Sequence, residues 1–190
     1  MKKLNLGCGR NIKPGWTNID SYPVEGVDIV ADIDDCNNIK LPFEDNSIDE
    51  FLLNHVFEHL KNPLSTMQEM HRIAKNGSRA ILRVPYGSSD DASEDPTHVR
   101  LCFLNTFLYF SQPAYWRADY GYRGDWDVEK IILSVSRIRY SSASYEIIMN
   151  DVKHLRNIVH DMTVIMTAVK PIRLPLKELQ SVTQVDFIFI

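Results

Sequence analysis

A pair of glycines follows the first apolar run of the chain. Gly7 and Gly9 come directly after residues 4–6, where glycine permits a sharp turn and lets a ligand lie against the backbone. A tight turn with no chemical role is the alternative interpretation. The loop departs from the dinucleotide-binding fingerprint, because position 12 is Ile12 and no third glycine follows. The sequence therefore argues against a nicotinamide cofactor.

Two aspartates stand at the ends of the next two apolar runs. Asp20 is placed to accept hydrogen bonds from two ribose hydroxyls, and Asp32 could accept one from an exocyclic amine such as that of adenine. Each could instead be a turn or helix-capping residue. Because acids at successive strand ends face one edge of a sheet, the pair favours a nucleoside site.

A histidine-rich segment, His55-Val56-Phe57-Glu58-His59, follows the fourth apolar run. Its spacing matches a metallopeptidase pattern whose ligands need a regular helix, but its position at the exit of a buried strand argues against a peptidase. The favoured interpretation is structural, with Glu58 and His59 bracing the helix that follows. In the other interpretation, His59 or His55 has a functional role at the mouth of a substrate pocket.

A further histidine lies beside a rigid turn, in Asp95-Pro96-Thr97-His98. Histidine is the side chain best matched to removing a proton near neutral pH. We therefore expect His98 to be the general base, with His59 as the second candidate. A hydrogen-bonding structural role for His98 remains the alternative.

Short apolar runs around these residues predict strands at 4–6, 17–20, 27–32, 50–54 and 79–84, and helical spacing predicts a helix at 64–74 that stops near Gly77. The stretch from Gly9 to Asp20 is short for a crossover helix. Strands that alternate with helices or long connections indicate an α/β fold with a mostly parallel sheet. β-rich runs at 128–140 and 163–169 are expected to be closing strands that pair antiparallel.

The segment between the fifth strand and the closing strands is long, irregular and rich in aromatic residues. It covers about residues 86–127, and insertions of this kind are often lids or binding loops. We expect one domain over 1–175 that contains this lid, followed by a tail at 176–190. The apolar end of the tail, at 187–190, suggests docking on its own core or on a second subunit, as in a homodimer.

Composition sets limits on the partners. The chain has 21 Lys and Arg against 25 Asp and Glu, a formal charge of −4, without the basic excess usual in proteins that grip nucleic acid. Its three cysteines form no CxxC pair. No apolar run approaches the roughly 18 residues of a membrane span, and Gly7 interrupts any signal-peptide core. We expect a cytoplasmic protein with a small-molecule acceptor, no nucleic acid and no membrane.

Several motifs in order resemble the class I S-adenosylmethionine-dependent methyltransferases. They are Leu4-Asn5-Leu6-Gly7-Cys8-Gly9, Pro14-Gly15-Trp16-Thr17-Asn18-Ile19-Asp20, Asp28-Ile29-Val30-Ala31-Asp32, Leu41-Pro42-Phe43-Glu44-Asp45 and His55-Val56-Phe57-Glu58-His59-Leu60. The resemblance extends from Leu4 to about Pro85 and implies a Rossmann-like sandwich with S-adenosylmethionine as cofactor. It implies these cofactor-binding residues: Gly7, Cys8 and Gly9 against the methionine part, Asp20 at the ribose, Asp32 and the Ile33 backbone at adenine, and Asn54 near the sulfonium.

The resemblance also implies a reaction. We expect methyl transfer from S-adenosylmethionine to a hydroxyl or amine of a small polar acceptor, such as a sugar or another metabolite. The alternative is a catalytically inactive module on the same fold that binds the cofactor or a partner. Some members of the family bind a divalent metal through a similar segment and a later histidine, which would here be His55, Glu58, His59 and His98. The expectation adopted is that no metal is bound.

Overall fold

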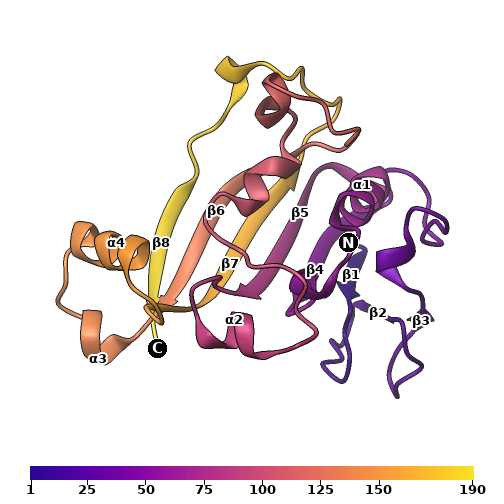
Figure 1. The fold of residues 1–190 in the computed structure, drawn as a ribbon. Helices are drawn as coiled ribbons and strands as arrows, with labels where there is room; N and C mark the ends of the chain where they lie inside the picture. The colour runs from indigo at the N-terminus through magenta and orange to yellow at the C-terminus, as the bar shows by residue number, and fades with distance from the viewer.

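One eight-stranded sheet runs through the computed structural model, which describes residues 1–190, in the order β3-β2-β1-β4-β5-β7-β6-β8 (Figure 1). The strands are β1 (Lys3–Leu6), β2 (Thr17–Asp20), β3 (Ile29–Val30), β4 (Ile48–Asn54), β5 (Ala74–Pro85), β6 (Trp126–Val135), β7 (Val159–Ala168) and β8 (Gln184–Phe189). Strands β1 to β5 pair parallel, and β7 pairs antiparallel with both β5 and β6. The mostly parallel sheet with antiparallel closing strands is confirmed.

The helices are few and short. They are α1 (Pro63–Ile73), α2 (Asp90–Glu94), α3 (Arg137–Tyr140) and α4 (Tyr145–His154), with the 3-10 turns η1 (Ile33–Asp35), η2 (Phe57–His59), η3 (Thr106–Phe110), η4 (Gln112–Trp116) and η5 (Lys177–Leu179). Figure 1 shows α1 beside the central strands β4 and β5, and α4 beside the edge strand β8. No helix is both long and apolar enough to cross a lipid bilayer.

No helix connects β1 to β2, as the shortness of that stretch predicts. Two buried amides hold the connection instead. Asn5 Nδ2 donates to Asn18 Oδ1 at 2.9 Å and to the Asn11 carbonyl at 2.8 Å, and the same Asn18 oxygen accepts from Lys13 N at 2.8 Å. Because these bonds satisfy buried polar groups, the glycine loop has a fixed position without a helix behind it.

Some element bounds differ from those predicted. The helix ends at Ile73, and β5 begins at Ala74 and passes through an irregularity that contains Gly77, whose φ is +79°. β3 is only two residues long, because Asp32 already caps η1. β6 ends at Val135, and residues 137–140 form α3 instead of continuing the strand.

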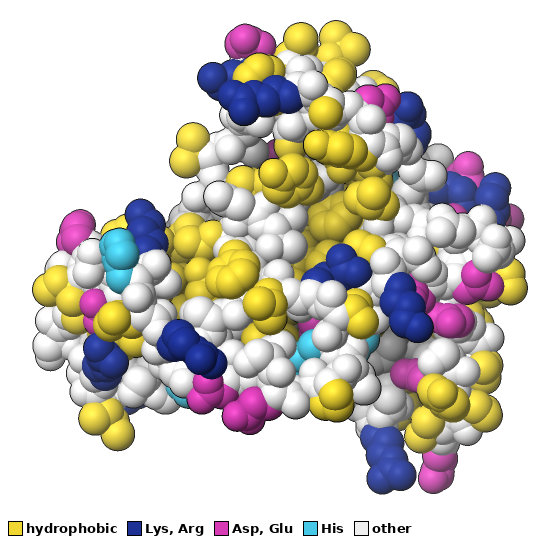
Figure 2. Space-filling view, in the orientation of Figure 1, with side chains coloured by type: hydrophobic (Ala, Val, Ile, Leu, Met, Phe, Trp, Pro, Cys, Tyr) yellow, Lys and Arg dark blue, Asp and Glu magenta, His cyan; other side chains and the backbone are white.

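The aromatic insertion after β5 belongs partly to the core. Phe107, Phe110 and Tyr122 are buried, and the Phe57 ring lies 4.7 Å from Phe107 and 5.6 Å from Phe110. Other aromatic side chains of the insertion stay exposed: Phe103, Tyr109, Trp116 and Tyr120. In Figure 2, hydrophobic side chains gather in a hollow near the middle of this face. The insertion is therefore anchored by one set of rings and exposes another.

The end of the chain joins the same sheet. β8 pairs parallel with β6, and Phe187 of β8 packs against Tyr145 of α4 at 5.3 Å between ring centroids. The tail docks on the chain's own sheet, which is one of the two arrangements expected. Contact with a second subunit stays a prediction.

Candidate functional site

A cavity of about 400 Å³ opens at the carboxyl ends of β1, β2 and β3. Four of the residues expected at a cofactor line it, namely Gly7, Asp20, Asp32 and Ile33. The cavity is not lined by the other three expected residues, which are Cys8, Gly9 and Asn54. The side chain of Cys8 is buried, and Asn54 is the last residue of β4. The volume lies within the usual range for small-molecule sites.

Both glycines of the loop adopt a left-handed backbone. Gly7 has φ +63°, and a Cβ there would lie 2.6 Å from Val56 Cγ2, so only glycine allows β1 and the exit of β4 to approach this closely. Gly9 has φ +50° and no atom within 4 Å of the position of a Cβ. One glycine serves packing, and the other leaves space for a ligand against the backbone.

Backbone amides orient Asp20. Its Oδ2 accepts from Gly9 N at 2.7 Å and its Oδ1 accepts from Tyr22 N at 3.0 Å. A carboxylate offers about four acceptor positions, so two remain for ligand hydroxyls. The turn role and the binding role of Asp20 are compatible.

Asp32 also has a structural partner. It caps η1, with Oδ1 accepting from Asp34 N at 2.9 Å, while Oδ2 accepts no hydrogen bond. Asp34 in turn accepts from Lys61 N at 3.0 Å and Asn62 N at 2.7 Å, which fastens η1 to the start of α1. One oxygen of Asp32 is therefore held in place and the other is free at the cavity.

A second, open cleft of about 660 Å³ lies beside the first. Apart from two prolines its lining is imidazole and carboxylate: His55, His59, His98, Asp91, Glu94 and Asp95. His59 lines both this cleft and the cofactor cavity. The two candidate bases named from the sequence, His98 and His59, thus lie together, with ring centroids 4.7 Å apart.

Hydrogen bonds define the tautomers of both rings. His98 Nδ1 lies 3.1 Å from the Ala92 carbonyl, which can only accept. His59 Nδ1 lies 3.0 Å from Thr97 Oγ1, whose own hydrogen goes to Asp95 Oδ1. Each Nδ1 therefore carries a hydrogen, and in the neutral rings Nε2 carries the lone pair.

Glu58 lies beneath these rings and is the residue whose environment the sequence did not reveal. Its side chain is 1% exposed, and neither oxygen accepts a hydrogen bond. His55 Nδ1 is 3.4 Å from Oε1, and His98 Nε2 is 4.0 Å from it. Glu58 raises the pKa of His55 above its usual value; burial opposes this rise, and Asp161 adds to it. The structure gives Glu58 no helix-capping hydrogen bond.

His55 itself has a strained backbone, with φ +55°. A left-handed conformation in a non-glycine residue costs on the order of 1 kcal/mol or more, and such residues cluster at functional sites. Val56, which follows it, forms the contact with Gly7. One turn after β4 thus shapes both the cofactor cavity and the histidine cleft.

Known proteins with this fold define its class. Residues 4–82 match the family described as a methyltransferase domain (Methyltransf_11). A SAM-dependent methyltransferase of Archaeoglobus fulgidus superposes with a TM-score of 0.53 at 18% identity, over 87% of this chain and 85% of that one. Another, of Aquifex aeolicus, gives 0.53 at 15% identity over 89% and 82%. The chain has the class I Rossmann-like fold of these S-adenosylmethionine-dependent methyltransferases, and residues 4–82, less than half of the chain, match a methyltransferase domain.

Two further comparisons limit what the fold implies. A curated relative, the uncharacterized protein MJ1123 of Methanocaldococcus jannaschii, is 33% identical over 93 residues, which cover 43% of this chain and 42% of that protein. The chain thus spans less than half of that relative. The [4+2]-cyclase SpnF shares the fold, with a TM-score of 0.55 at 15% identity over 88% of this chain and 75% of that one.

The methyltransferase domain and the SAM-dependent methyltransferases of the same fold support S-adenosylmethionine as the cofactor. The residues that line the cavity fit it: Gly7 places bare backbone in the lining, and Asp20 and Asp32 offer free carboxylate acceptors at the end of the sheet. The comparisons thus support the expectation that the cofactor is S-adenosylmethionine.

Proposed function

We propose that this protein transfers a methyl group from S-adenosylmethionine to a hydroxyl or amine of a small polar acceptor. The observation that carries the proposal is the adjacency of two sites, with His59 lining both the cofactor cavity and the polar cleft. A cofactor and an acceptor held in neighbouring sites meet the main requirement of the reaction, which is alignment.

Seven residues would hold the cofactor in this proposal. They are Gly7, Cys8 and Gly9 at the methionine part, Asp20 at the ribose hydroxyls, Asp32 and the Ile33 backbone at adenine, and Asn54 near the sulfonium. When bound, S-adenosylmethionine supplies a methyl group activated by the positive sulfur. The chain has to exclude water, orient the acceptor and remove its proton.

Nε2 of His98 is the proposed proton acceptor, with Nε2 of His59 as the second candidate. The Ala92 carbonyl fixes the His98 ring with its lone pair on Nε2. That atom lies 4.0 Å from Glu58 Oε1 and 3.8 Å from Asp95 Oδ2, and both carboxylates stabilise the imidazolium that forms. An imidazole in this state suits proton removal near neutral pH.

The lining of the cleft supports a small acceptor rich in hydrogen-bond donors. Asp91, Glu94 and Asp95 face it, and no Lys or Arg lines it. Carboxylates accept from hydroxyls and amines and repel phosphates. The cleft therefore favours a sugar or an amine over a nucleic acid or a phosphorylated acceptor.

The second candidate is a catalytically inactive module that binds the cofactor or a partner, because the fold alone does not imply methyl transfer: it also occurs in SpnF, which is named as a [4+2]-cyclase. Incubation with S-adenosylmethionine labelled at the methyl carbon and with fractions of polar metabolites separates the two. Label in a sugar or amine fraction supports methyl transfer. Cofactor binding without transfer to any fraction supports the module, and absence of cofactor binding overturns both.

A further inference from the structure

Glu58 is a buried carboxylate that accepts no hydrogen bond, and a protonated His55 is the nearest group that can offset its charge. It is 1% exposed, and both oxygens lack a hydrogen-bond donor. Burying an ionised carboxylate is costly, so such groups normally pair with a cation or bind a metal. The groups that face it are imidazoles: His55 at 3.4 Å and His98 at 4.0 Å. His55 offsets this charge only when it is protonated, whereas a metal cation held by Glu58 and the imidazoles would offset it with neutral rings.

Two of the imidazoles that line the cleft, His59 and His98, are oriented to donate lone pairs from Nε2. His98 Nδ1 is engaged by the Ala92 carbonyl, and His59 Nδ1 by Thr97 Oγ1 at 3.0 Å and by the Thr97 carbonyl at 3.3 Å. In metal sites, a ligating histidine almost always donates its other N–H to an oxygen acceptor, which fixes the ring and its tautomer. Both rings have this second contact already.

We propose that Glu58, His59 and His98 bind one divalent first-row transition-metal ion. One donor atom of each residue lies within 4.8 Å of the other two. Donors bound to one ion at about 2.0–2.2 Å lie about 3–3.5 Å apart. His98 Nε2 and Glu58 Oε1 are 4.0 Å apart, so a shift on the order of 1 Å or less brings this pair to the spacing of ligands on one ion.

The donor set selects the kind of metal. Two imidazoles with one carboxylate suit zinc, manganese or iron, whereas magnesium prefers oxygen ligands and water. Three protein ligands leave coordination positions open, and the cleft of about 660 Å³ gives the ion and a small ligand a path to them. The sequence alone favoured a site without metal; the unpartnered Glu58 is the observation that argues the other way.

This inference goes beyond methyl transfer and holds whether or not the protein is a methyltransferase. A bound ion would occupy Nε2 of His98, so proton removal by that atom and metal ligation are alternatives. Either arrangement would promote loss of the acceptor's proton, because a metal ion lowers the pKa of a water or hydroxyl group bound to it.

Titration of chelator-treated protein with Zn²⁺, Mn²⁺ and Co²⁺ tests the site, with calorimetry and the thermal unfolding midpoint as readouts. We expect one equivalent of at least one of these ions to bind and to raise the midpoint. Glu58→Gln, which keeps the shape of the side chain, and His98→Ala should each weaken binding at least tenfold. His154→Ala is the matched control, because His154 is exposed on α4 and bonds only to the Asn150 carbonyl.

Three results would overturn the proposal. They are absence of binding of all three ions to the wild type, unchanged affinity in Glu58→Gln, and equal affinity for Mg²⁺. If His98→Ala does not fold, as circular dichroism would show, Glu58→Gln alone decides. Affinity for S-adenosylhomocysteine, measured on the same samples, distinguishes failure of the metal site from failure of the cofactor site.

Discussion

Two backbone amides hold Asp20 in position, so its free acceptor positions need no rearrangement to receive a ribose. We predict that Asp20→Ala weakens binding of S-adenosylhomocysteine by about 1.5–3 kcal/mol, the range for hydrogen bonds to a charged group. Calorimetry measures the change, and Asp186→Ala on β8, far from the cavity, is the control. Unchanged affinity in Asp20→Ala would mean that the ribose is held elsewhere.

His98 is fixed by one hydrogen bond through Nδ1, and its Nε2 faces Glu58 and Asp95. If it removes the acceptor's proton, His98→Ala should lower kcat by roughly 10²–10⁴-fold and leave cofactor affinity nearly unchanged. Kinetics with the acceptor identified by labelling, together with calorimetry, separate the two effects. Full turnover in the variant would remove His98 from the mechanism, and loss of cofactor binding would make its role structural.

In the loop between β1 and β2, Gly7 and Gly15 constrain the backbone for different physical reasons. Gly7 and Gly15 both have positive φ, but only at Gly7 would a Cβ meet another residue, Val56 at 2.6 Å. We predict that Gly15→Ala costs about 1 kcal/mol of unfolding free energy, from backbone strain alone. Gly7→Ala should cost at least about 1 kcal/mol more and weaken cofactor binding. Urea denaturation of both variants measures the difference; equal losses would refute the close approach.

α1 packs on the end of β7 through a buried histidine. His71 Nε2 lies 3.1 Å from the Val169 carbonyl, and burial lowers the pKa of His71 below its usual value. The unfolded chain therefore takes up this proton more readily, so the stability contribution is complete above about pH 6.5 and is lost as pH falls. We expect the unfolding free energy to fall less between pH 7 and 5 in His71→Gln than in the wild type. Equal pH slopes would contradict this. His55, whose pKa is raised, is common to both chains and cancels in the comparison.

At the level of elements, the sequence predicted best where local signals act alone. Residues 17–20 form the predicted strand because a turn precedes it and an aspartate ends it. The predicted strand at 128–140 was too long, because its apolar pattern continues into α3, where Tyr140 is buried by a helical turn. The irregularity in β5 was not predictable, since it depends on how Ala74 pairs with Ile48 of β4.

For the site, local motifs identified residues that the fold then brings together. Gly7, Asp20 and Asp32 stand in strand-end motifs and line one cavity. The contact of Val56 with Gly7 and the unpartnered carboxylate of Glu58 were not predictable, because both depend on how the turn after β4 packs against distant segments. Burial and missing partners are properties of the whole molecule, and one sequence does not reveal them.

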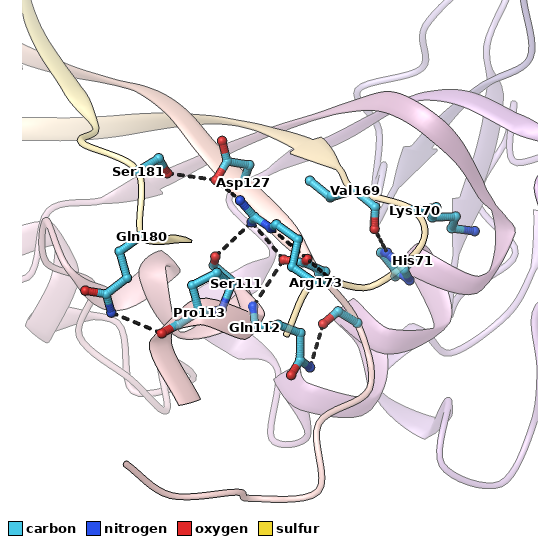
Figure 3. Close-up of polar contacts among 12 residues, drawn as sticks. His71, Ser111, Gln112, Pro113, Asp127, Val169, Lys170, Arg173, Gln180 and Ser181 are labelled. Carbon is cyan, nitrogen blue, oxygen red and sulfur yellow. Dashed lines mark hydrogen bonds and ion pairs between the residues drawn. The ribbon is translucent and has the colours of Figure 1, made fainter. Parts of the chain in front are cut away.

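One ion pair, between Arg173 and Asp125, connects the lid and the start of β6 to the segment that links β7 to β8. Its contribution to stability therefore reports on how distant parts of the molecule are held together. Arg173 donates to Asp125, which is fully buried, through Nε and Nη2, each at 2.9 Å, and also reaches Ser111 and Asp127 (Figure 3). Removing one partner of a buried pair leaves the other charge uncompensated.

We predict that Arg173→Met lowers the unfolding free energy by about 3 kcal/mol, the low end of the range for a buried pair, because the Arg173 side chain is itself 21% exposed. Arg123→Met is the control: its pair with Asp119 is exposed on both sides, and such pairs contribute little to the unfolding free energy because solvent screens them. Denaturant unfolding gives both values. The double variant Arg173→Met/Asp125→Asn should recover part of the loss, since it removes the buried charge that the single variant leaves behind. A loss below about 1 kcal/mol in Arg173→Met would show that the lid and the chain's last segment are held by apolar packing alone.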